Sequence, residues 1–151
     1  MALTHVGPAG EAKMVDVGSK PVSRRTARAA GRIRLRPETV ELIRANQVRK
    51  GDVLATARIA AIAGAKRTAD LIPLCHNIPI DVVEVSFTLE PDAVAIEARA
   101  ACEARTGIEM EALTAVAVAA LTIYDMCKAA DKTMVIETIR LLEKTKHDIP
   151  R

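Results

Sequence analysis

Residues 107–130, GIEMEALTAVAVAALTIYDMCKAA, decide the fold. Their apolar side chains recur at spacings of three and four, which predicts an α-helix of about six turns that buries one stripe. The stripe consists of Leu113, Val116, Ala117, Ala120, Ile123, Tyr124 and Cys127. Because the ionisable residues lie at the two ends, we expect the middle of this helix to form core and its ends to carry chemistry.

Glu111 and Asp125 lie at opposite ends of this helix. They are 14 positions apart, which places them on nearly one face but about 21 Å from each other at about 1.5 Å per residue. A single small-molecule site cannot contact both residues of one chain. If both act in one reaction, the site must be shared between subunits.

The rest of the chain predicts an α+β fold. β-Branched or alternating residues indicate strands, and Pro37 and Asp52 suit the starts of two more helices. The expected strands are 26–35, 80–89, 94–105 and 134–142, and the expected shorter helices are 37–45 and 53–66. This order matches a ferredoxin-like (split βαβ) arrangement, an antiparallel sheet with helices packed on one face. We expect residues 1–23 to form a flexible arm and 24–151 a single domain.

Composition narrows the class of protein. Phe87 and Tyr124 are the only aromatic residues, so bases cannot stack on aromatic rings. Three cysteines without metal-ligand spacing favour a reducing compartment. The first residues lack a signal peptide, and the apolar runs are judged too short to span a bilayer. The expectation is a cytoplasmic protein with no membrane partner.

The net charge of +3 conceals an asymmetry. Residues 1–67 carry 14 Lys/Arg and 5 Asp/Glu, whereas residues 68–151 carry 8 and 14. A partner with phosphates would suit the first half. A solvated basic surface is the alternative.

Asp125 and Lys128 form an i, i+3 pair at the end of the long helix. Such a pair on a surface stabilises a helix by about 0.2–0.5 kcal/mol and needs no further role. Here it ends an apolar helix, where partial burial would shift either pKa and create a proton donor or acceptor. Glu109 and Glu111, at the other end, either cap the positive helix terminus or belong to a site.

Residues 71–76, LIPLCH, predict a non-helical loop that contacts a ligand. Adjacent side chains of an extended segment point in opposite directions, which argues against a dyad of Cys75 and His76. We expect His76 to act as a hydrogen-bond donor or acid/base and the Cys75 backbone to line the site. The other histidines, His5 and His147, lie near the chain ends, so no metal site is expected.

Lys50-Gly51-Asp52 is similar to phosphate-handling loops, because Gly allows close backbone approach and a helix N-terminus follows. The Walker pattern is absent. A lysine in an exposed turn is the alternative. Arg24 and Arg25, on the arm, either close over a polyphosphate or remain solvated.

Four blocks resemble the molybdenum cofactor biosynthesis protein C family, the cyclic pyranopterin monophosphate synthases. They are MVDV at 14–17, KGDVLATARIA at 50–60, DLIPLCH at 70–76 and the long helix. The blocks run in the family's order and cover most of residues 11–142. The resemblance implies a ferredoxin-like homohexamer, assembled as a trimer of dimers, with its active site at a subunit interface.

The resemblance also implies a lyase of molybdenum cofactor biosynthesis. Its substrate would be a purine triphosphate, (8S)-3',8-cyclo-7,8-dihydroguanosine 5'-triphosphate, supplied by an upstream radical SAM GTP cyclase. Its products would be cyclic pyranopterin monophosphate and diphosphate. No metal or other cofactor is implied for this step.

The family's site residues map onto this chain one by one. The catalytic positions fall on Asp125, Lys128 and Lys50. Substrate-contacting positions fall on Leu74, Cys75, His76, Met110 and Glu111, with Glu109 beside them, and Asp16, Arg25 and Lys144 match further pocket positions. After Leu142 many members continue with a Gly-Gly-Lys-Ser-Gly-like loop, whereas this chain has Glu143-Lys144-Thr145-Lys146-His147.

The reaction requires proton transfers and a cation for the departing diphosphate, which these residue types supply. Two other classes remain open on the sequence. A regulatory module could hold a GTP-like ligand without converting it, and turnover would separate that class from an enzyme. A nucleic-acid-binding subunit could use the basic half, but the lack of aromatic residues and the acidic second half count against a nucleic-acid partner.

Overall fold

One antiparallel sheet organises residues 6–150, the part of the chain that this computed structural model describes. Its strands are β1 (Ser23–Arg34), β2 (Ile80–Glu90), β3 (Ala93–Ala104) and β4 (Val135–Asp148), and the helices are α1 (Pro37–Arg44), α2 (Val53–Lys66), α3 (Thr68–Leu71) and α4 (Glu109–Cys127). The strand order is β2-β3-β1-β4, with β1 antiparallel to both of its neighbours. The ferredoxin-like α+β fold predicted from the sequence is confirmed.

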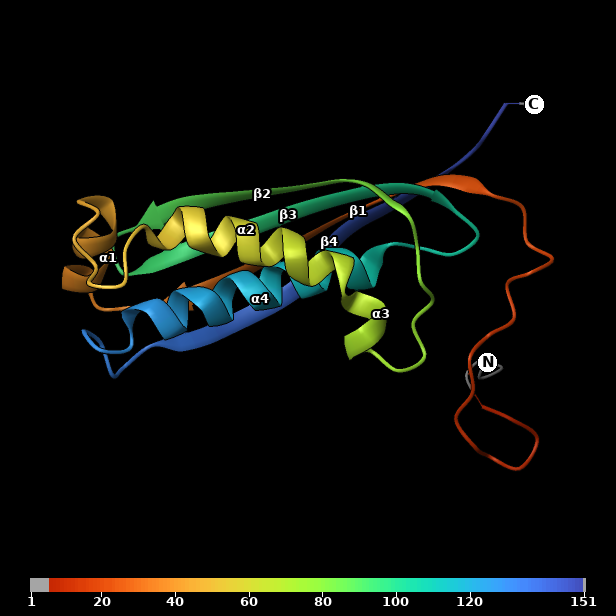
Figure 1. Cartoon of the computed structure of the whole chain (residues 1–151), viewed down its shortest axis with the longest axis horizontal. Helices are drawn as coiled ribbons and strands as arrows, with labels where there is room; N and C mark the ends of the chain where they lie inside the picture. Colours follow the sequence, from red (N-terminus) through yellow and green to blue (C-terminus); the bar gives the residue numbers. More distant parts are fainter. Residues whose placement is uncertain (1–5, 151) are drawn as a thin grey trace.

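Helices α2 and α4 lie side by side over one face of the sheet (Figure 1). Small residues allow them to approach closely. A Cβ added to Gly64 of α2 would come within 2.7 Å of the Val118 side chain of α4. The core between helices and sheet is aliphatic, as expected for a chain with two aromatic residues.

The buried stripe of α4 differs in part from the predicted one. Val116, Ala120, Ile123 and Cys127 are buried as expected, but Tyr124 is exposed. Ala112, Ala115 and Ala119 are buried instead. Apolar residues occupy a wider part of the helix circumference than the part that contacts the sheet and α2. The spacing of apolar residues alone therefore could not show which of them are buried.

Strand β4 is longer than predicted. The expected strand 134–142 continues to Asp148, because residues 143–148 pair with β1 along its whole first half. The charged sequence of this extension has no apolar alternation, which explains the error. The pairing places Lys144 opposite Ala27 and Lys146 opposite Arg25.

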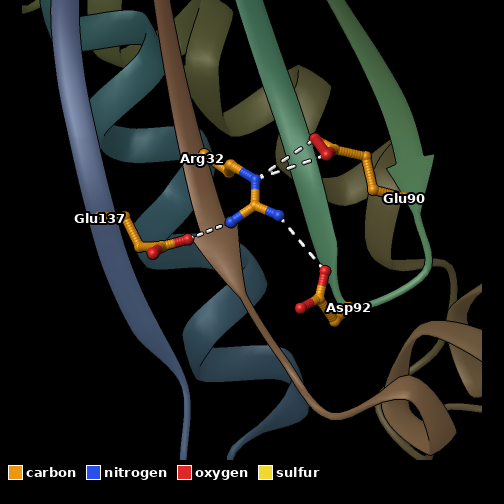
Figure 2. Close-up of polar contacts among 4 residues, drawn as sticks. All are labelled: Arg32, Glu90, Asp92 and Glu137. Atoms are coloured by element: carbon orange, nitrogen blue, oxygen red, sulfur yellow. Dashed lines mark hydrogen bonds and ion pairs between the residues drawn. The ribbon is translucent and has the colours of Figure 1, made fainter.

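The open face of the sheet carries paired charges. Arg32 of β1 contacts Glu90, Asp92 and Glu137, which come from β2, the β2–β3 turn and β4 (Figure 2). Arg28 pairs in the same way with Glu97 and Glu143. The basic first half of the chain is therefore neutralised on this face by the acidic second half, and it does not offer the free phosphate-binding surface considered from the sequence.

Helix α4 is long and apolar enough to cross a bilayer by length and composition alone. The expectation that no apolar run reaches that length was therefore wrong. Half of the helix is buried within this fold, where it packs on β1, β3 and α2. That packing explains its apolar sequence as a core helix.

Asp131, just after α4, connects this end of the helix to the start of α1 through hydrogen bonds. Its side chain is buried and accepts hydrogen bonds from the Arg36 N–H at 2.8 Å, the Thr39 hydroxyl at 2.9 Å, and the N–H and hydroxyl of Thr133 at 2.8 and 2.7 Å. Burial alone would raise the pKa of Asp131, but these hydrogen bonds outweigh it and lower the pKa to about 2.

We expect Asp131 to stabilise the fold through its charge. A carboxyl whose pKa falls from 3.8 to about 2 on folding contributes about 2 kcal/mol to the free energy of unfolding above pH 4. Because its folded pKa is lowered, that contribution is lost as the pH falls from about 4 to about 2. Urea unfolding of the wild type and Asp131→Asn across this range should show a stability gap that narrows on acidification. A gap that stays constant with pH would contradict this account.

Candidate functional site

Lys50, Asp125 and Lys128 converge at the C-terminal end of α4. The Asp125 carboxylate lies 3.0 Å from the Lys128 ammonium and 3.0 Å from the Lys50 ammonium, which also donates to the Asp125 carbonyl oxygen at 3.1 Å. The hydrogen bond from Lys128, followed by that from Lys50, lowers the pKa of Asp125. Asp125 is therefore a carboxylate at neutral pH, suited to hold two lysines or to accept a proton.

This cluster is more exposed than predicted. The side chains of Asp125 and Lys128 expose 57% and 55% of their surface, so the partial burial expected from the apolar helix does not occur within one chain. The contact of Lys50 with Asp125 distinguishes this cluster from an ordinary i, i+3 pair. It comes from the connection between α1 and α2, 75 residues away.

A tight turn carries Lys50 to Asp125. Gly51 has a φ of +113°, a conformation that side chains disfavour, and its N–H donates to the Val48 carbonyl. Asp52 then caps α2 by accepting from the Ala55 N–H at 3.0 Å, as predicted. Because a carboxylate already occupies this helix N-terminus, the loop does not offer the free anion site suggested by its sequence.

Glu111 marks the opposite end of α4. Its side chain is 3% exposed, and its Oε1 atom is buried with no hydrogen-bond partner among the described residues. Burial, reinforced by the charge of Glu109, raises the pKa of the Glu111 carboxyl. Neither glutamate caps the helix, whose N-cap is Ile108 without a side-chain hydrogen bond. Glu111 is thus a buried carboxyl able to carry or accept a proton. Both glutamates lie in the first turn of α4, where the helix dipole favours negative charge, but neither forms a hydrogen-bonded cap.

Cys75 and His76 point to different partners. The Cys75 thiol lies 3.9 Å from Glu111 Oε2, and His76 Nε2 lies 2.7 Å from the Val15 carbonyl oxygen. Burial, with the charge of Glu111, raises the pKa of the Cys75 thiol, so this cysteine is not an activated thiolate. The predicted absence of a Cys–His dyad is consistent with this geometry.

The contact with Val15 fixes the tautomer of His76. A carbonyl oxygen can only accept, so Nε2 of the ring must carry the proton and, in the neutral ring, Nδ1 is the free acceptor. Long-range proton–nitrogen NMR spectra of histidine-labelled protein should show the Nε2–H tautomer for His76, with His76→Gln used to assign the signals. The Nδ1–H tautomer would contradict the contact.

A cavity of about 290 Å³ lies beside these residues. Its lining includes Leu74, Cys75, His76, Glu109 and Met110. A smaller cavity of about 180 Å³, lined by Arg25, Lys144, Thr145 and Lys146, shares Glu109 with it. Nine predicted substrate-contacting residues therefore gather at one end of the molecule when Glu111 and the arm residue Asp16 are included.

Asp16 is connected to the residues around His76 only through its neighbour in the chain. Its neighbour Val15 bonds His76, while the Asp16 carboxylate accepts from the Gly18 N–H at 2.8 Å. Arg24 and Arg25 lie on β1, not on the arm, and Arg24 pairs with Glu103 at 3.2 Å while Arg25 lines the small cavity. The two arginines therefore cannot close over one ligand together.

The predicted site residues thus form two clusters at opposite ends of α4. We call Lys50, Asp125 and Lys128 the lysine cluster, and the residues around Glu111, Cys75 and His76 the Glu111 cluster. The helix between Glu111 and Asp125 is unbroken, so the separation of about 21 Å holds within one chain. Lys146 and Val15 were missed from the sequence, since their places depend on the pairing of β4 and the path of the arm.

Neither cluster provides a metal site. No group of three or more His, Cys, Asp or Glu side chains with a geometry that could hold a metal ion occurs within residues 6–150. His5, named in the sequence-based argument, lies outside the described residues.

Comparison with known proteins identifies relatives over nearly the whole chain. The MoaC family matches residues 14–147. A cyclic pyranopterin monophosphate synthase of Chloroflexus aurantiacus is 58% identical over 144 residues, covering 94% of this chain and 88% of that protein. The enzymes of the same name from Thermomicrobium roseum and Peptoclostridium acidaminophilum are 58% and 54% identical, covering 94% and 96% of this chain and 87% and 92% of theirs.

Proposed function

Since this chain belongs to the MoaC family, we propose that its Glu111 cluster and the lysine cluster of a neighbouring subunit together form one active site. The chain is a cyclic pyranopterin monophosphate synthase, a lyase of molybdenum cofactor biosynthesis, and it acts on a GTP-derived substrate. The observation that carries the shared site is the length of α4, which keeps Glu111 and Asp125 about 21 Å apart in one chain.

A stripe of half-buried and exposed residues on α4 supports this arrangement. Its residues recur at spacings of three and four along the helix and run from the cavity to the lysine cluster: Met110, Leu113, Ala117, Leu121, Tyr124 and Lys128. Leu121 and Tyr124, in the C-terminal half of the stripe, are exposed apolar residues of the kind that mark contact surfaces. Antiparallel packing of two such stripes about a twofold axis would bring Lys128 of each chain towards Met110 of the other.

Strand β4 extends the same apolar surface. Ile139 and Leu141 pair with Gly31 and Ala29, whose side of the sheet faces the helices, yet both remain exposed. Helix α4 contacts β4 but leaves these two side chains partly uncovered. A second copy seated on α4 and β4 would bury these side chains and, with them, the exposed lysine cluster.

The substrate of the shared site is (8S)-3',8-cyclo-7,8-dihydroguanosine 5'-triphosphate. Glu111, held in a buried environment, and His76 would move protons on the ring system, because a carboxyl group and an imidazole can each donate or accept a proton. Asp125 would hold Lys50 and Lys128, which would donate protons and stabilise charge on the departing diphosphate. No metal or redox cofactor takes part in this scheme.

We infer the wider assembly from the resemblance to the family. The shared site requires at least a dimer, and the full assembly is a homohexamer built as a trimer of dimers. The enzyme operates in the cytoplasm and receives its substrate from a radical SAM GTP cyclase. Sedimentation analysis of the purified protein should give the mass of six chains.

The direct experiment supplies the product of the radical enzyme. The purified protein should convert it to cyclic pyranopterin monophosphate and release diphosphate, while GTP alone should remain unchanged. A well-folded protein that leaves the cyclised compound intact, or that converts GTP without prior cyclisation, would overturn the proposal.

A further inference from the structure

The cations of β1 have different neighbours on the two faces of the sheet. On the open face, Arg24, Arg28 and Arg32 each contact at least one carboxylate. On the helix face, Arg25 lies directly opposite Lys146 in the register of β1 and β4. Like charges directly opposite each other on neighbouring strands are unfavourable. Three of the arginines on the open face of β1 thus have carboxylate partners, whereas Arg25 and Lys146 face each other as two cations.

These cations line one small cavity. Arg25, Lys144 and Lys146 surround about 180 Å³ together with Thr145, and Glu109 is the one carboxylate in the lining. Within the described residues, none of the three cations forms an ion pair, and the Arg25 Nε atom is buried without a hydrogen-bond partner. A buried, unpaired guanidinium N–H is costly unless an acceptor outside the chain satisfies it. An anion would satisfy this donor and relieve the repulsion between the strands.

The size of the cavity limits the anion. Pockets for drug-sized ligands begin at about 300 Å³, so about 180 Å³ suits a small anionic group and not a whole nucleotide. Glu109 also lines the larger cavity beside Cys75 and His76. A ligand with its ring system in the larger cavity could therefore extend an anionic tail past Glu109 into the smaller one.

We propose that Arg25, Lys144 and Lys146 form a phosphate subsite, in which Lys146 is a further substrate-binding residue. The subsite holds phosphate groups of the triphosphate chain, so this inference rests on the proposed function for the identity of the ligand. Arg25 supplies its directional N–H donors, and the two lysines supply compact charges. Lys146 belongs to the site only because β4 continues past residue 142 and places it opposite Arg25.

The test uses inorganic pyrophosphate as the probe. Binding to the wild type is measured by titration calorimetry at about 0.15 M ionic strength, where exposed charges more than about 8 Å apart are largely screened from each other. Lys146→Gln should weaken pyrophosphate binding by about tenfold, equivalent to about 1.4 kcal/mol. The matched control is Arg140→Gln, which removes one charge from β4 on the open face, opposite Ala30, and should leave binding unchanged.

Kinetics with the cyclised substrate provide the second measurement. Lys146→Gln should raise KM by about tenfold with kcat nearly unchanged, since Lys146 binds the phosphate chain and takes no part in proton transfer. Equal pyrophosphate affinity for the wild type and Lys146→Gln, or equal loss in Lys146→Gln and Arg140→Gln, would overturn the subsite. If the protein binds pyrophosphate through Lys146 but does not convert the cyclised substrate, the phosphate subsite is supported and the proposed function is contradicted. The subsite and the proposed function can therefore fail separately.

Discussion

Replacing Lys128 with alanine, or Asp125 with asparagine, should lower kcat by about 100-fold or more and leave the fold intact. This is the scale expected when an acid/base or charge-stabilising group is removed from a reacting centre. Both side chains are more than half exposed, so the pair itself should contribute little to the stability of the chain. The measurements are kcat with the cyclised dihydro-GTP and the thermal midpoint of each variant.

A matched control is available in α1. Arg44 and Glu41 form another exposed i, i+3 pair, with Nε and Oε1 3.2 Å apart, and neither residue belongs to either cluster. Glu41→Gln removes that pair and should change neither kcat nor Tm appreciably. If Asp125→Asn and Lys128→Ala behave like this control, the pair is an ordinary surface ion pair and has no catalytic role.

Lys50 explains why the lysine cluster differs from that control. Asp125 binds a cation from its own helix and a second from the turn before α2, and the Lys50 ammonium also reaches the last turn of α4 through the Asp125 carbonyl. Such convergence of two ammoniums on one carboxylate fixes all three groups relative to one another. It gives the cluster a defined geometry even where no other subunit covers it.

Much of the fold was predictable because its elements are set by local sequence. The spacing in residues 107–130 located α4, Asp52 located the start of α2, and the β-branched run at residue 80 located β2. The order of these elements was sufficient to select the ferredoxin-like arrangement. The separation of Glu111 from Asp125 also followed from the sequence, since it depends only on an unbroken helix.

Features that depend on long-range pairing were not predictable in the same way. The extension of β4 has a charged sequence, and only its register with β1 shows that Lys146 meets Arg25. The neutralisation of Arg32 by three carboxylates likewise requires strands that are far apart in sequence. The contact between His76 and Val15 depends on the path of the arm, for which the sequence gives no periodic signal.

The separation within α4 has a consequence for mixed oligomers. Glu111→Ala and Asp125→Asn should each be inactive alone, because each removes one part of every shared site. In a mixed dimer, one site loses both residues and the other retains both, one from each chain. A site built within one chain would be damaged in every subunit and could not recover in any mixture.

The most direct measurement of the shared site is therefore the activity of co-expressed Glu111→Ala and Asp125→Asn chains, purified together through two different affinity tags. With equal amounts and random pairing, about half of all dimers are mixed and each has one intact site, so about a quarter of wild-type activity should return before selection of the mixed species. Chains carrying both substitutions, co-expressed with Glu111→Ala, provide the inactive control. Recovery of activity in the tagged mixed oligomers is the result that the shared site predicts, and folded mixed oligomers that remain as inactive as either parent would contradict it.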